Sequence, residues 1–297
     1  MPNPLVIVGW IFDRVNDSFM HAILERIPAP FFAVDLRFIF GRHVFGVCQT
    51  GRPLGNLQTR NTGWCTINCG RILVVPRIHF QLQLAELKDK LLAMAALAQL
   101  AVESAVDAFL MRDQGLCQYV KQNETAINTA QRELDEMAYE LLAKEQPMAI
   151  DLRFILAVIK INGDLERIGD QSMAMSRRTR EMLYLDAVEL PVDYAAMGEY
   201  AGRMIRTAVQ SLLEGDARLA DTVREMDDEI DRMNRRAHSD LLKLIQEQPK
   251  LTQQAMTGLM VSRNLERIAD HASNIATDVI FWIRGADVRH QLSLSMD

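Results

Sequence analysis

Two acidic segments with nearly the same sequence stand 100 residues apart in the chain, DLERIGDQSMAM and NLERIADHASNI. The first copy places Glu166 four residues before Asp170, and the second places Glu266 four residues before Asp270. On an α-helix this spacing brings both carboxylates to one face. Hard divalent cations prefer several carboxylate oxygens, so each copy is a candidate metal site.

In the second copy the oxygen-bearing stripe continues beyond the acidic pair. Asn274 and Asp278 follow at further steps of four residues, which predicts a ladder of four such side chains. The alternative is a solvated helix face whose acids form surface ion pairs with Arg167, Arg263 or Arg267, each worth under about 1 kcal/mol. The repetition favours cation binding, because a solvated face gives no reason for both copies to carry the same acids.

Acidic residues also occur on the segment that precedes each copy. These are Glu124, Glu133 and Asp135 in the first case and Asp227, Asp228 and Asp231 in the second. They are weaker candidates, because the register between two helices is not readable from sequence. His271 follows Asp270 directly and points about 100° away from it on a helix, which indicates a polar-face histidine rather than a ligand.

Catalytic patterns are missing from the sequence. A carboxylate-bridged di-iron enzyme needs Glu three residues before His on two helices, and none of the six His has Glu there. Neither a G-x-x-x-x-G-K-[ST] loop nor a G-x-S-x-G elbow is present. A net charge of −6 argues against a duplex nucleic-acid binder. We therefore expect a protein that is not an enzyme and does not bind nucleic acid.

Residues 1–77 differ in composition from the remainder. They hold three of the four Cys and six of the nine Pro, and their eight Arg and four acids give a charge of +4, which leaves −10 for the rest. Since no helical or strand period is sustained there, we predict an irregular segment. It is either a small extra module or, as we favour, a stretch upstream of a true start near Val74 or Val75.

The cellular compartment is predicted from what the chain contains. The cysteines form no pair of C-x-x-C units, which fits reduced cytosolic thiols. No apolar run reaches the roughly 18 residues needed to span a bilayer, and the short run near the N-terminus has no preceding basic residue. We expect a cytoplasmic protein.

Helical periodicity predominates from His79 onward. The apolar spacing predicts helices over His79–Met111, Gln118–Lys144 and residues 147–185, with Gly115 as a break. A second set is predicted over Tyr194–Glu214, Ala217–Glu247 and Lys250–Arg284. Each set ends in the helix that carries the acidic motif. The expected fold is all-α, with two tandem three-helix bundle repeats over residues 78–188 and 189–288 and a tail over 289–297.

Two three-helix units that each end in [D/N]LERIxD resemble the PhoU family of phosphate-uptake regulators. The resemblance covers residues 78–288, and its opening helix reads HFQLQLAELKDKLLAMAALAQLAVESAVDAF. It implies a cytoplasmic, often homodimeric, negative regulator that links a phosphate ABC transporter to a two-component system. The implied partners are the transporter's ATPase subunit and a membrane sensor histidine kinase, so that any membrane association is indirect.

Some members of the family carry clusters of iron or another metal on the acidic motif faces. The resemblance therefore implies a cluster of iron or another divalent metal here. The candidate ligands from the pattern and the resemblance together are Glu166, Asp170, Glu266, Asp270, Asp164 and Asn274, with Asn264 secondary. The first copy departs from the family pattern with Ala174 where the second has Asn274, which predicts weaker metal binding there. Residues 1–77 lie outside the pattern.

Two other functions remain as alternatives. A helical scaffold or chaperone-like binder without metal would also use long amphipathic helices. An amphipathic membrane-surface role is less consistent with the sequence, because a part of the chain that carries −10 is repelled by anionic lipid.

Overall fold

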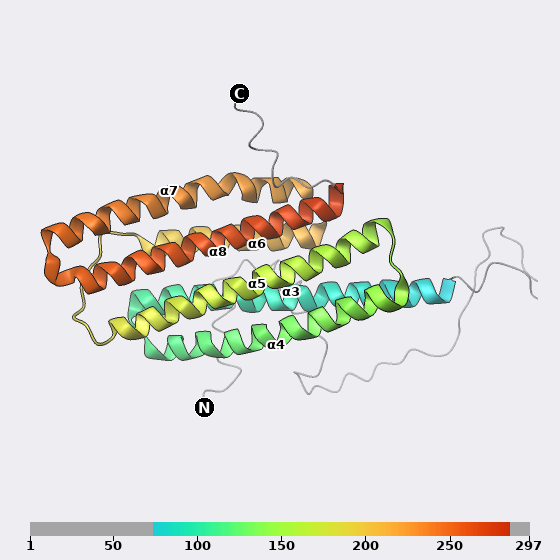
Figure 1. Ribbon diagram of the computed structural model, residues 1–297, viewed down its shortest axis with the longest axis horizontal. Coiled ribbons are helices and arrows are strands. Elements are labelled where there is room, and N and C mark those ends of the chain that lie inside the picture. The colour runs from blue at the N-terminus through green and yellow to red at the C-terminus, as the bar shows by residue number, and fades with distance from the viewer. Residues whose placement is uncertain (1–73, 286–297) are drawn as a thin grey trace, which may run out of the picture. The chain divides into compact units, whose positions relative to one another are not determined.

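The computed structural model describes residues 74–285, which form an all-α arrangement (Figure 1). Within that range no strand occurs. The elements, in chain order, are α3 Val74–Met111, α4 Gln114–Glu145, α5 Ala149–Met182, α6 Tyr194–Glu214, α7 Ala217–Glu247, the 3-10 helix Pro249–Leu251 and α8 Thr252–Arg284.

The starts and ends of the helices follow local capping chemistry. The Asp113 carboxylate accepts from the amides of Gly115 and Leu116, and similar aspartate caps begin α6 and α7. Gly215 and Gly285 end α6 and α8 in the left-handed conformation, which glycine adopts without strain. The predicted bounds of α6 and α7 are confirmed.

Other predicted helix ends were wrong by a few residues. Gly115 does not break the chain, because Asp113 caps α4 and the glycine lies in its first turn. Pro147 precedes α5 rather than opening it, and the predicted start of the last helix, Lys250, lies in the 3-10 helix that precedes α8. α3 begins inside the segment predicted to be irregular, and Pro76 is compatible with its first turn. The rest of the predicted segment 1–77 and the tail 289–297 lie outside the described residues.

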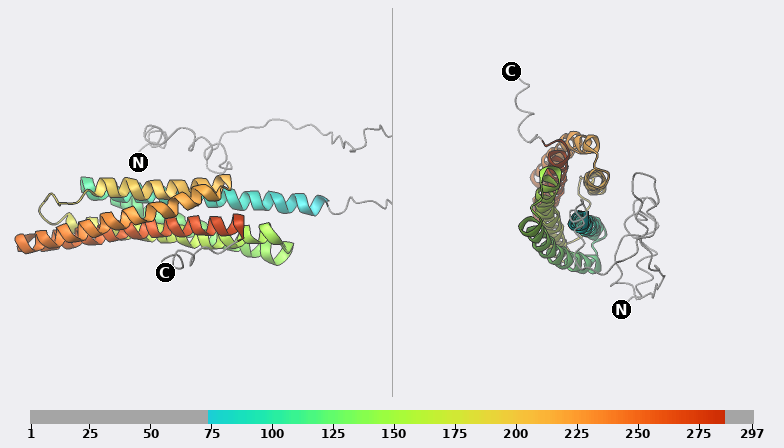
Figure 2. Two further views of the ribbon diagram at one scale, coloured as in Figure 1. Left: turned by 90° about the horizontal axis from the view of Figure 1, so that it is seen from above. Right: turned by 90° about the vertical axis from the view of Figure 1, so that its right-hand side faces the viewer.

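The two motif helices are neighbours. α4, α5, α8 and α7 contact one another in that order and form a curved row, seen end on in Figure 2. α3 and α6 lie on the inner side of this row and contact each other, since Lys88 donates to the Leu213 carbonyl at 2.8 Å. The central pair, α5 and α8, therefore joins the two three-helix repeats.

The predicted apolar stripe of α3 forms part of the core. Leu87, Leu91 and Met94 are fully buried, and Leu84 is nearly so. α3 is the one helix in the described part of the chain that is long and apolar enough to cross a membrane, so the prediction that no segment has this length and composition was wrong. More than half of that segment is buried inside the bundle, as in the core helices of many soluble proteins.

Candidate metal centre

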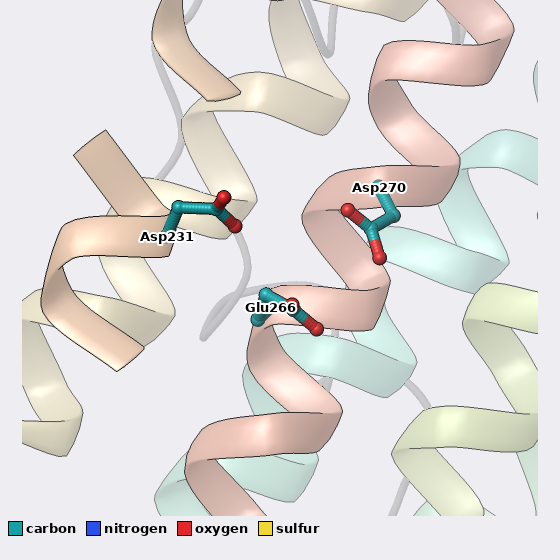
Figure 3. A group of neighbouring side chains, drawn as sticks. All are labelled: Asp231, Glu266 and Asp270. Carbon is teal, nitrogen blue, oxygen red and sulfur yellow. The ribbon is translucent and has the colours of Figure 1, made fainter. Parts of the chain in front are cut away.

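Three carboxylates from two helices converge in the second repeat. Asp231 on α7 faces Glu266 and Asp270 on α8 (Figure 3), and each offers an oxygen within 4.8 Å of the other two. The motif spacing aligns Glu266 with Asp270 on α8. Burial of Val223 and Ile230 fixes which face of α7 turns toward them. The two predicted second-copy ligands thus belong to a cluster with a third acid.

Parts of this cluster are buried without a protein partner. Glu266 is only 8% exposed. Its Oε1 accepts from Arg263 Nη1 at 2.6 Å, while its Oε2 has no hydrogen-bond donor among the described residues. Asp227, one turn before Asp231, likewise has a buried Oδ1 that lacks a donor within the described chain. Buried oxygens of this kind are costly unless something else satisfies them.

The electrostatics of the cluster oppose its ionised state. Burial, followed by the charges of Asp270 and Asp231, raises the pKa of Asp227 to about 6. Burial and the neighbouring Asp270 raise the pKa of Glu266, although Arg263 acts in the opposite direction. Burial and Asp231 raise the pKa of Asp270. Four acids are therefore held together in a place where a cation would stabilise their charged forms.

The donor set fits a hard divalent metal. Carboxylate oxygens from α7 and α8 are the ligand type that Mg²⁺, Mn²⁺ and Fe²⁺ accept. The buried orphan oxygens of Glu266 and Asp227 distinguish this group from an ordinary exposed acidic face. Asp227, Asp231, Glu266 and Asp270 are therefore the residues of the second-repeat cluster.

The first copy of the motif is arranged differently. Burial, followed by the charge of Asp170, raises the pKa of Glu166, and the charge of Glu124 on α4 acts in the same direction. Arg167 approaches both motif acids, with its Nε 3.5 Å from Glu166 and its Nη1 3.3 Å from Asp170. On α4, Asn128 donates from Nδ2 to Glu124 at 2.8 Å. We call Glu124, Asn128, Glu166 and Asp170 the first-repeat cluster.

Comparison with protein families matches the PhoU domain model twice, over residues 91–179 and 194–279. The chain belongs to the PhoU family. Its two PhoU domains contain the two motif copies, and the PhoU-like fold expected from sequence is confirmed.

Several PhoU relatives match most of their own length. A Pseudomonas putida protein named phosphate-specific transport system accessory protein PhoU homolog is 37% identical over 215 residues, 71% of this chain and 83% of the relative. The PhoU homolog 1 of Thermotoga maritima is 27% identical over 223 residues, 74% of this chain and 95% of the relative.

Solved PhoU structures share the fold. The crystal structure of PhoU from Pseudomonas aeruginosa has 35% sequence identity and a TM-score of 0.67, and covers 70% of this chain and 100% of that one. The phosphate transport system regulatory protein PhoU from Streptococcus pneumoniae, at 24% identity and a TM-score of 0.65, shows the fold alone and covers 70% and 99%.

Two other predicted ligands lie in the contact between the PhoU repeats rather than in either cluster. The Asp164 carboxylate accepts from His271 Nδ1 at 2.8 Å and from Asn274 Nδ2 at 3.4 Å. The predicted ladder is therefore wrong beyond Asp270, since Asp278 pairs with Lys160 of α5 at 3.1 Å. Four residues advance a helix by about 40° beyond a full turn, so three such steps rotate the stripe from α7 to α5.

The α7 acids are candidate ligands that the sequence supported only weakly. Asp227 and Asp231 repeat the four-residue spacing of Glu266 and Asp270, which was a readable signal. Their neighbour Asp228 is exposed. Only the packing of α7 against α8 shows that Asp227 and Asp231, and not Asp228, belong to the cluster. His271, read as a polar-face residue, has a specific partner in Asp164.

Proposed function

We propose that this chain is an accessory protein of phosphate transport that regulates uptake without being an enzyme. The observation that carries the proposal is the match of both repeats to the PhoU domain. A relative that the chain matches over 83% of its length is named for the phosphate-specific transport system. One solved structure is called the phosphate transport system regulatory protein PhoU.

The proposed mode of action is protein–protein contact in the cytoplasm. The regulator docks on the transporter's ATPase subunit and on a sensor histidine kinase, and keeps kinase activity low when phosphate is plentiful. Apolar side chains stand exposed on the motif helices, with Leu156 at 38%, Met256 at 42% and Met260 at 43%. Such side chains are suited to partner contact and, in a homodimer, to contact with a second copy.

A divalent metal in the second-repeat cluster is part of the proposal. Asp227, Asp231, Glu266 and Asp270 would hold it, and the ion would supply the positive charge that these buried acids lack. α7 and α8 would then be tied together at the cluster. The ion thereby stiffens the outer edge of the bundle, where α7 ends the row of helices.

The competing function is a metal-free helical scaffold or chaperone-like binder unrelated to phosphate. It would use the same exposed apolar side chains. The buried oxygens of Glu266 and Asp227 that lack a hydrogen-bond donor favour metal binding over this alternative, because a metal-free scaffold has no use for buried, unsatisfied carboxylate oxygens.

Deleting the gene in its source organism tests the regulatory role. We expect a phosphate-starvation reporter, such as secreted alkaline phosphatase, to become active in phosphate-rich medium and to be silenced again by the full chain. The doubly substituted Glu266→Gln, Asp270→Asn chain tests the metal, with Asp240→Asn on the exposed face of α7 as its control. A reporter that stays silent in the deletion strain, with phosphate uptake unchanged, would contradict the proposal.

A further inference from the structure

The two clusters occupy equivalent positions in the two repeats. The motif residues of α5 recur in α8 100 positions later, and the buried positions of α4 recur in α7 103 positions later, as Val120 and Ile127 do in Val223 and Ile230. By the same step Glu124 corresponds to Asp227 and Asn128 to Asp231. The two clusters can therefore be compared residue by residue.

One carboxylate of the second-repeat cluster is an amide in the first. Asp231 offers an oxygen toward Glu266 and Asp270, whereas Asn128 turns its Nδ2 toward Glu124 and donates to it at 2.8 Å. Asn128 in place of an aspartate means one anionic ligand fewer, and its hydrogen bond occupies an oxygen of Glu124. Asparagine binds cations through its neutral amide oxygen, and with Nδ2 turned toward Glu124 that oxygen lies on the other side of the amide group, so the loss is geometric as well as electrostatic.

Arginine contacts also differ between the clusters. Arg167 lies within 3.5 Å of Glu166 and 3.3 Å of Asp170, so one guanidinium serves both motif acids. Among the described residues its counterpart Arg267 forms no ion pair with Glu266 or Asp270, although its charge acts to lower the pKa of both acids. In the second repeat Arg263 instead pairs with one oxygen of Glu266 and leaves the other buried and unpartnered.

We infer that the two repeats have diverged in function, so that only the second-repeat cluster binds divalent metal. In the first-repeat cluster, the Arg167 guanidinium supplies the positive charge that a metal supplies in the second, and the neutral Asn128 amide adds a hydrogen bond to Glu124. This inference rests on the metal part of the proposed function. It makes metal a link between α7 and α8, whereas the compensating contacts of the first-repeat cluster lie within single helices, Asn128 with Glu124 in α4 and Arg167 with the two motif acids in α5.

Reciprocal substitutions in the full chain test the inference. Asp231→Asn gives the second cluster the residue type of the first, and Asn128→Asp with Arg167→Gln does the reverse. Mn²⁺ alone serves as the probe, titrated by calorimetry and counted by elemental analysis after gel filtration. Asp240→Asn controls for loss of an unrelated acid on α7, and circular dichroism checks that every variant is folded.

We expect one class of Mn²⁺ sites in the unsubstituted chain and in Asp240→Asn. Asp231→Asn should weaken that class by at least about tenfold, the lower end of the loss seen when the surroundings of a metal are disturbed. The Asn128→Asp, Arg167→Gln chain should acquire a second class. Failure to acquire it, or two equal classes in the unsubstituted chain, would overturn the inference and leave the metal proposal intact.

Mn²⁺ binding that is absent from the unsubstituted chain would overturn both the inference and the metal proposal. The regulatory role would be untouched, since the reporter assay measures it separately.

Discussion

Replacing Asp227 by Asn should stabilise the metal-free protein at pH 7. In the unsubstituted protein the pKa of Asp227 is raised from 3.8 to about 6, because the side chain is partly buried and faces Asp270 and Asp231. A difference of roughly 2 pKa units corresponds to about 3 kcal/mol. Solvent reaches part of the side chain and screens the interaction, so we expect a gain of about 1–2 kcal/mol in the free energy of unfolding.

The sign of the pH dependence follows from the same shift. Asp227 holds its proton more tightly in the folded protein than in the unfolded chain, so ionisation at pH 7 disfavours folding. Lowering the pH from 7 through about 6 toward 4 should relieve this cost in the unsubstituted protein. The stability advantage of Asp227→Asn should therefore shrink over that range. Urea unfolding in EDTA, followed by far-ultraviolet circular dichroism, measures both proteins at each pH.

Metal should reverse the order of stability. A divalent ion that binds only the folded state stabilises it in proportion to the logarithm of its concentration. Asp227→Asn removes a ligand and should gain less from the ion than the unsubstituted chain. If Asp227→Asn in EDTA is no more stable at pH 7, or its advantage grows as the pH falls, the electrostatic reasoning about the cluster is wrong. Asp240→Asn, on the exposed side of α7, should change little.

Further predictions concern the packing of the helices. Gly198→Ala should cost about 1–3 kcal/mol, because the added Cβ would lie 2.7 Å from a Val106 methyl where α6 meets α3. Gly163→Ala, which has no atom within 4 Å of its added Cβ, should instead stabilise α5 by about 0.5–1 kcal/mol. A melting temperature that falls equally in both variants would refute the packing argument. His271→Ala should cost about 1 kcal/mol, as its hydrogen bond to Asp164 is lost, and chemical unfolding that detects no change would show that this contact is unimportant.

The sequence predicts most of the fold because its signals are local. The apolar stripe of α3 and the bounds of α6 and α7 depend only on periodicity and on caps such as Asp193 and Gly215. Errors arose where two local signals compete, as at Gly115, which follows a strong capping aspartate. The predicted repeat boundaries and the favoured start near Val74 or Val75 stay predictions.

Only half of the candidate site was predicted with comparable success. Glu266 and Asp270 lie on one helix, so their spacing alone places them together. Asp231 comes from another helix, and its approach depends on how α7 packs against α8, which no local pattern specifies. Asn274 was misplaced because the slow rotation of a four-residue stripe was neglected. Metal binding by any of these residues is still to be measured.

The contact between α5 and α8 has an evolutionary consequence. The two helices run antiparallel, since Arg153, Lys160 and Asp164 of α5 meet Trp282, Asp278 and His271 of α8 in reverse order. Because α8 repeats α5, the equivalent residues of the two halves are exchanged by a local two-fold axis. This is the symmetry of a homodimer interface.

An ancestor of half the length could therefore have paired with itself through its motif helix, and gene fusion would have fixed that pair in one chain. After fusion the two halves were encoded by separate parts of one gene, so they no longer had to have the same sequence. Asn128 and Asp231 could then take different residue types at one ancestral position, an option that a symmetric dimer of identical subunits does not have.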